Sequence, residues 1–126
     1  MADESSLSIN WQARKGINIQ LNASYTRDIA GNNLLSAIQT IGTSAVAIAI
    51  GGASAAGHLA LQNLGAYPID VAIDSEAADA FATLAPQPNG KTGGGDALYI
   101  PCKAGVVYYV KATGGSSDLA VAVSEA

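Results

Sequence analysis

Residues 7–25 read LSINWQARKGINIQLNASY, and apolar and polar residues alternate along both halves of this stretch. Leu7, Ile9 and Trp11 occupy every second position, with serine and asparagine between them. Successive side chains of a β-strand point to opposite faces, so a period of two predicts a half-buried strand. The polar corner at residues 14–16 separates it from a second alternating run at 17–25, and the pair predicts a β-hairpin.

Short apolar runs continue along the rest of the chain, separated by turns that contain Gly, Pro or Ser. No run keeps the helical period of 3.6 residues for three turns. The pattern predicts an all-β fold, a single antiparallel β-sandwich, jelly-roll-like, over residues 7–126, with a flexible N-terminal arm at residues 1–6. Beyond the hairpin, we expect strands at residues 34–41, 45–50, 57–63, 67–74, 80–84, 97–101, 105–111 and 118–125.

The composition excludes several classes of function. The chain of 126 residues is long enough to bury one sizeable core, and its single cysteine rules out an intrachain disulfide. A net charge of -4 with few charged residues predicts no binding to nucleic acid. The apolar run at residues 43–56 is shorter than the roughly 20 residues of a membrane-spanning helix, so we expect no membrane partner. The acidic, polar start predicts synthesis in the cytoplasm without a secretory signal.

Three groups of residues could in principle carry chemistry, and each has a simpler interpretation. The Gly-Lys-Thr triplet at 90–92 resembles the end of a nucleotide-binding loop, but the motif's first glycine is replaced by Ala85. His58 and Cys102 could serve acyl transfer, yet an outward histidine and a packed thiol are the better interpretations. The carboxylates at 70, 74, 76 and 79 lack calcium-loop spacing and predict a solvated face. We therefore expect no enzyme, metal or cofactor.

The remaining candidates are contact residues rather than catalytic ones. Adjacent Tyr108 and Tyr109 must face opposite sides of their strand, so one belongs to the core and the other to the surface. An exposed aromatic residue marks either a subunit interface or a glycan platform, and the interface is favoured. Polar residues on the outer face of the hairpin could either support contact between subunits or face water. The candidate capsid or subunit contacts are Trp11, Asn18, Gln20, Asn22, His58 and Tyr109.

Five segments together resemble small structural virion proteins of tailed bacteriophages. They are IGTSAVAIAIG (41–51), GHLALQNLG (57–65), FATLAP (81–86), AGVVYYVKA (104–112) and LAVAVSEA (119–126). In those proteins, a strand that begins with glycine and an aromatic residue leads to Asn-Leu, and a Leu-x-Pro-Gly turn follows. Here His58 replaces the aromatic residue, and Leu84-Ala85-Pro86 leads into a glycine-rich loop.

The resemblance implies a capsid decoration, or cement, protein on the outer surface of a phage head. Its expected partners are the major capsid protein and further copies of itself, as a homotrimer bridging neighbouring capsid subunits. The alternative is a tail, head-fibre or receptor- and glycan-binding virion module.

Overall fold

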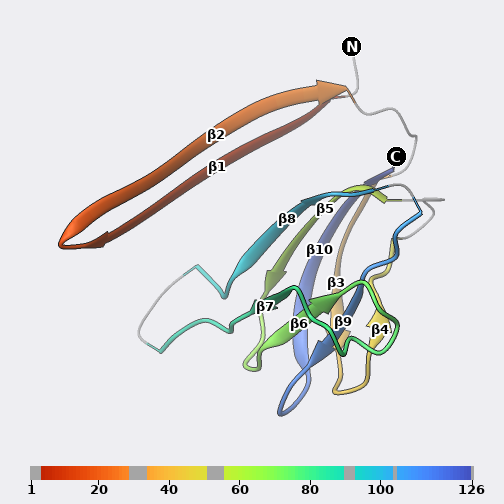
Figure 1. The fold of residues 1–126 in the computed structure, drawn as a ribbon. Helices are drawn as coiled ribbons and strands as arrows, with labels where there is room; N and C mark the ends of the chain where they lie inside the picture. The colour runs from red at the N-terminus through yellow and green to blue at the C-terminus, as the bar shows by residue number, and fades with distance from the viewer. Residues whose placement is uncertain (1–3, 29–33, 51–55, 90–92, 104, 126) are drawn as a thin grey trace. The chain divides into compact units, whose positions relative to one another are not determined.

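The computed structural model describes residues 4–28, 34–50, 56–89, 93–103 and 105–125. All regular structure within them is β-strand, which confirms the all-β prediction. The chain divides into two compact units, Met1–Ala30 and Gly31–Ala126. The strands are β1 (Glu4–Lys15), β2 (Ile17–Asp28), β3 (Leu34–Ile41), β4 (Val46–Ala47), β5 (Ala56–Asn63), β6 (Ile69–Ala72), β7 (Ala82–Leu84), β8 (Ala97–Pro101), β9 (Tyr109–Ala112) and β10 (Ser117–Glu125) (Figure 1).

The first unit is the predicted hairpin, and β1 and β2 pair along their full length. The register sets Trp11 opposite Leu21 and Lys15 opposite Ile17, with Gly16 alone at the turn. Gly16 has a φ of 74°, in the left-handed region that glycine adopts without steric cost. Both strands are longer than predicted, and together they form a two-stranded sheet.

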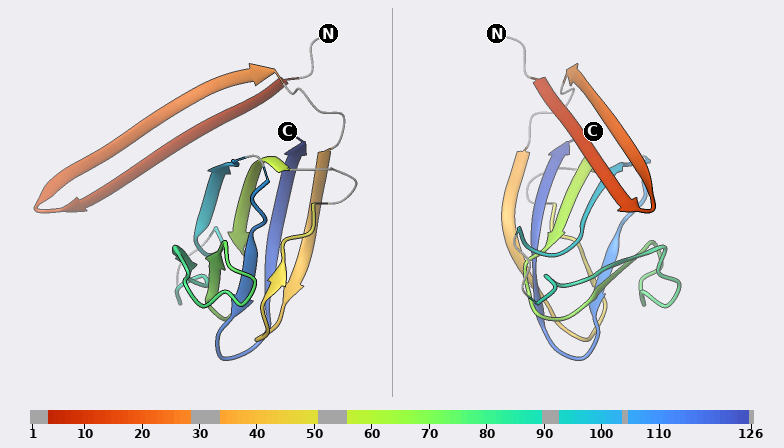
Figure 2. Two further views of the ribbon diagram at one scale, coloured as in Figure 1. Left: turned by 45° about the vertical axis from the view of Figure 1, so that its right-hand side comes forward. Right: turned by 90° about the vertical axis from the view of Figure 1, so that its left-hand side faces the viewer.

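The second unit is a β-sandwich of two four-stranded antiparallel sheets, as predicted (Figure 2). One sheet has the order β3-β10-β5-β8, and the other has the order β4-β9-β6-β7. The pairing is nested, since β6 pairs with β7, β5 with β8, β4 with β9 and β3 with β10. Strands far apart in sequence therefore become neighbours, and the C-terminal β10 lies in the interior of its sheet.

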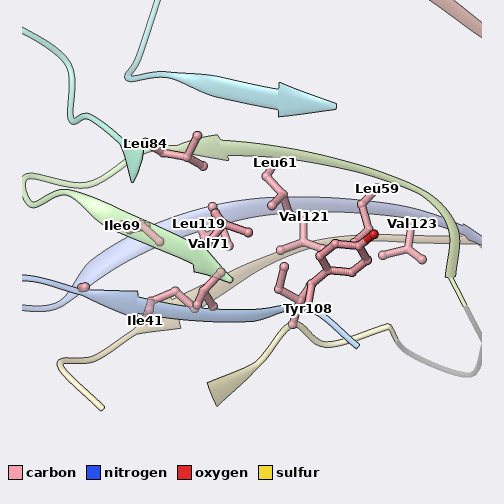
Figure 3. Packing of buried hydrophobic residues seen from close by; sticks show 13 residues of the cluster. Ile41, Leu59, Leu61, Ile69, Val71, Leu84, Tyr108, Leu119, Val121 and Val123 are labelled. Atoms are coloured by element: carbon pink, nitrogen blue, oxygen red, sulfur yellow. The ribbon is translucent and has the colours of Figure 1, made fainter. Parts of the chain in front are cut away.

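The core lies between the two sheets of this sandwich (Figure 3). Alternate residues of β5 and β10 point inward from one sheet and meet the inward residues of β6 and β9 from the other. Each fully buried aliphatic side chain stabilises the fold by roughly 1.5–3 kcal/mol. The central members are Leu59, Leu61, Ile69, Val71, Val110, Leu119, Val121 and Val123.

A buried amide holds several elements of the sandwich together. Asn63, at the end of β5, is fully inaccessible to solvent. Its Nδ2 donates to the carbonyl oxygens of Tyr67 and Leu84, each at 2.8 Å. Its Oδ1 accepts from the hydroxyl of Ser117 at 2.8 Å and from the backbone N–H of Gly65 at 3.0 Å. The amide thus satisfies four polar groups at once and ties β5 to the ends of β7 and β10.

Several predicted strands were too long, whereas β3 and β8 have the predicted bounds. The strand predicted at 45–50 reduces to β4, after which Ile48 enters the core. The strand at 67–74 reduces to β6, because the carboxylate of Asp74 accepts hydrogen bonds from the N–H groups of Ala78 and Asp79 and stabilises a turn there. The strand at 105–111 reduces to β9. The alternation of apolar and polar residues continues beyond the paired strand wherever the following loop also packs on the core. For these three strands of the sandwich, the pattern alone therefore overestimates the strand length.

The boundary between the units also differs from the predicted one after residue 6. Ser6 lies inside β1, and the division by contacts falls after Ala30. The two-stranded sheet of β1 and β2 falls within the first unit.

Candidate interaction surfaces

The predicted contact residues lie on four different surfaces rather than in one site. Trp11 lies on one face of the hairpin, and the strand alternation places the three polar residues of β2 on the other. His58 belongs to β5 and Tyr109 to β9, which are strands of different sheets. The candidates therefore belong to separate surfaces.

The apolar face of the hairpin carries large side chains that remain accessible to solvent. We define this face by Leu7, Ile9, Trp11, Ala13, Ile17, Ile19, Leu21, Ala23 and Tyr25. Trp11 and Leu21 lie opposite each other, and each is 54% exposed. A two-stranded hairpin alone is marginally stable in water, and large exposed apolar patches mark interaction sites. This face is thus the first candidate surface.

The polar face of the hairpin is lined mainly by amides and hydroxyls, with Arg14 near the turn. Asn22 pairs with Asn10 and Gln20 with Gln12, while Asn18 lies opposite Arg14. All three predicted residues of β2 are exposed. Such pairs stabilise a hairpin across its strands and remain hydrated, so this face suits a side turned to water.

The outer face of the β3-β10-β5-β8 sheet is floored by alanine. Ala122 lies beside Ala60 on β5 and beside Ser36 on β3, and Ala120 lies beside Ile38. These small side chains form the floor of a shallow hollow of about 500 Å³. Ile38, at its side, is 66% exposed. We call this surface the alanine floor, and it is the second candidate surface.

His58 lies at one end of the alanine floor and points outward, as predicted. Its Nδ1 is 3.1 Å from the hydroxyl oxygen of Ser124, and its ring stacks on Tyr99 at a centroid distance of 6.0 Å. The histidine thus has a structural partner on each neighbouring strand. Among the described residues, the hydrogen bond of His58 is with Ser124 and not with Cys102.

The two adjacent tyrosines face opposite sides, as the alternation predicts. Tyr108 is buried in the core, whereas Tyr109 points out of the β4-β9-β6-β7 sheet and is partly exposed. Burial raises the pKa of Tyr108, and the neighbouring Cys102 raises it further. Burial likewise raises the pKa of the Cys102 thiol, whose Sγ is 3.5 Å from the carbonyl oxygen of Ile100. A raised pKa lowers the thiolate fraction at neutral pH and makes this thiol a poor nucleophile.

We expect Cys102 to react with iodoacetamide at pH 7.4 at least about tenfold more slowly in the folded chain than in the denatured chain. The reason is that burial disfavours the thiolate and restricts access to the sulfur. Mass spectrometry over time measures the rate, and the chain in guanidinium chloride is the control. Equal rates in both states would show that the thiol is accessible and that its pKa is not raised by the fold.

The other groups considered for chemistry make local contacts in the part of the chain that the structure describes. Asp70 accepts a hydrogen bond from the hydroxyl of Thr83 at 2.7 Å, and the hydrogen bonds from Ala78 and Asp79 lower the pKa of Asp74. No group of His, Cys, Asp or Glu there could hold a metal ion. The Gly-Lys-Thr triplet at 90–92 lies outside the described residues.

The comparisons with known proteins found no match. The chain matches no family model, no curated protein and no solved structure. Within the described ranges, no helix is long and apolar enough to cross a membrane.

Proposed function

We propose that this chain is a structural assembly protein that acts by binding other protein subunits. The observation that carries this proposal is the hairpin, whose apolar face exposes Trp11 and Leu21 along strands of 12 residues each. Catalysis requires polar groups placed to react, whereas this surface offers apolar area, which drives association.

In its specific form, the proposal is a capsid decoration protein of a phage head. Two features support it besides the sequence resemblance. The nested pairing from β6–β7 out to β3–β10 is the order expected of a jelly roll, an architecture used by viral capsid and lectin domains. The described surface also offers apolar and amide contacts with little charge, which suits permanent protein contacts.

The proposed mechanism is mechanical. Copies of the chain, as a homotrimer, sit on the outer head surface and bridge neighbouring subunits of the major capsid protein. Each docked contact holds the others at high effective concentration, so modest contacts add up. Binding to the assembled head alone stabilises that head by mass action.

The test uses heads assembled from the major capsid protein of the genome that encodes this chain. We expect the wild-type chain to cosediment with these heads at a saturating stoichiometry and to raise their melting temperature. Leu21→Glu introduces a charge on the apolar face, separates the copies of the homotrimer and so removes the gain from multivalent docking, which should weaken binding to heads at least about tenfold. Gln20→Glu is the matched control, because it adds the same charge at the next residue on the opposite face.

Three results would contradict the proposal or part of it. Failure of the wild-type chain to bind heads would contradict the decoration role. Loss of binding in Gln20→Glu with binding kept in Leu21→Glu would assign the contact to the polar face instead. Thermal stabilisation by glycans, without binding to heads, would favour the receptor-binding alternative, which a jelly roll also suits.

A further inference from the structure

Two surfaces of this chain remain exposed, one with large side chains and one with small ones. The apolar face of the hairpin presents large side chains, with Trp11 and Leu21 at its middle. The alanine floor presents methyl groups at Ala60, Ala120 and Ala122. Packed sheets lie about 10 Å apart and fill the space between them by matching large residues with small ones. The large side chains of the hairpin face can therefore pack into the space left by the small side chains of the alanine floor.

The charges at the two surfaces are also complementary. Residues 1–30 carry three cations, Arg14, Lys15 and Arg27, against Asp3, Glu4 and Asp28, and two of the cations lie beside the hairpin turn. Residues 31–126 carry three lysines against seven carboxylates, one of which is Asp118. Lys15 lies at the turn end of the apolar face, and Asp118 lies two residues before Ala120 on the same outer face of the sheet. The cationic turn of one copy and the acidic sandwich of another attract each other.

We infer that the apolar face of the hairpin of one copy docks on the alanine floor of a second copy. This inference deepens the proposed assembly role, on which it rests, by naming the surfaces through which copies associate. Each copy gives one hairpin and receives one, either reciprocally in a dimer or around a ring such as a trimer.

The contact area favours this exchange over the pairing of two hairpins. A strand of 12 residues spans about 40 Å, and two strands are about 10 Å wide, so one face covers about 400 Å². Two hairpins packed face to face would bury about 800 Å² in total, below the 1,200–2,000 Å² or so of a stable interface. In the exchange each copy takes part in two contacts, so a reciprocal dimer buries about 1,600 Å², which reaches that range, and a ring buries the same area per copy. Hairpin pairing would also set large residues against large ones.

Trp11 is the single tryptophan of the chain, so its fluorescence reports on the hairpin face alone. The experiment measures mass by light scattering, together with the emission maximum and acrylamide quenching of Trp11, from about 0.1 to 100 μM. With rising concentration of the wild-type chain, we expect the mass to reach a multiple of 12.6 kDa while the emission shifts to the blue and quenching falls.

Variants of the floor test whether the partner surface is the one inferred. Ala122→Glu alters an exposed position in the other unit and should raise the dissociation constant at least about tenfold, with Trp11 becoming accessible. Ala80→Glu adds the same charge at an exposed position outside the floor and should behave as wild type. Circular dichroism checks folding. If Ala122→Glu does not fold, Ala60→Glu tests the same floor from the neighbouring strand.

Three outcomes would overturn the inference. A wild-type chain that stays monomeric with quenchable Trp11 would show that the copies do not associate. A monomer with protected Trp11 would show that the face is covered within one chain. Association lost in Leu21→Glu but kept in Ala122→Glu would assign the contact to paired hairpins. No heads are present in this experiment, so its failure is distinct from failure of the decoration role.

Discussion

Replacing Asn63 by aspartate is expected to lower the melting temperature of the sandwich by about 15–25 °C. The amide Nδ2 donates to two buried carbonyl oxygens, those of Tyr67 and Leu84. A carboxylate would place an oxygen against both of them and carry a charge into a fully inaccessible site. Each buried polar group left unsatisfied costs about 1–3 kcal/mol, which gives a loss of roughly 4 kcal/mol or more. Each kcal/mol shifts the melting temperature of a domain of this size by about 4–8 °C.

Thermal unfolding followed by circular dichroism measures this effect. Asn89→Asp makes the same chemical change at an exposed position and should shift the melting temperature by less than about 3 °C. Acidification should partly restore the Asn63→Asp variant, because burial favours the protonated acid, which can donate one hydrogen bond. The restored stability is present at low pH and is lost as the pH rises through the folded-state pKa. A variant as stable as wild type at neutral pH would contradict the role assigned to Asn63.

Replacing Leu119 by alanine is expected to reduce the free energy of unfolding by about 3–4 kcal/mol. Leu119 is fully buried on β10, which pairs with β3 on one side and with β5 on the other. Three carbon atoms would be lost from the part of the core that lies between the sheets. The neighbouring strands hold the backbone in place, so the cavity cannot collapse and its cost adds to the lost burial.

Unfolding in guanidinium chloride, analysed by linear extrapolation, measures this loss. Leu64→Ala is the matched control, because Leu64 is 46% exposed and its truncation should cost less than about 1 kcal/mol. The slope with denaturant should stay unchanged, since the surface exposed on unfolding changes little. Equal losses in both variants would mean that β10 is not at the centre of the core.

Assembly through exchanged hairpins would tie these properties of the fold to the proposed role. The sandwich is a stable base whose buried groups are satisfied, as the four hydrogen bonds of Asn63 illustrate. The hairpin has the opposite character, because its large apolar side chains gain little burial within their own unit. In such a protein the sandwich folds alone, and the apolar face of the hairpin is buried only on a partner. The stability of the hairpin would then depend on assembly.

Some features of the site could have been recognised from the sequence and were missed. Asn63 follows Leu59 and Leu61 in the same alternating phase, which is the inward phase of β5. An amide in that phase, with Gly65 two residues later, indicates a buried polar group that needs partners. The alanine floor is different. Ala60 and Ala122 lie 62 positions apart in the sequence and become neighbours only through the register of β5 and β10.

The sequence alone determined the all-β class, the hairpin, the bounds of β3 and β8, and the opposite orientations of Tyr108 and Tyr109. These properties follow from the strict alternation of side chains along a strand and from turn residues between strands, which are local. Only the tertiary structure decided the nested strand order, the four partners of Asn63, and the division of the chain into two units after Ala30. The reason is that alternation tells which residues turn inward, whereas partners are chosen by pairing between strands distant in the chain.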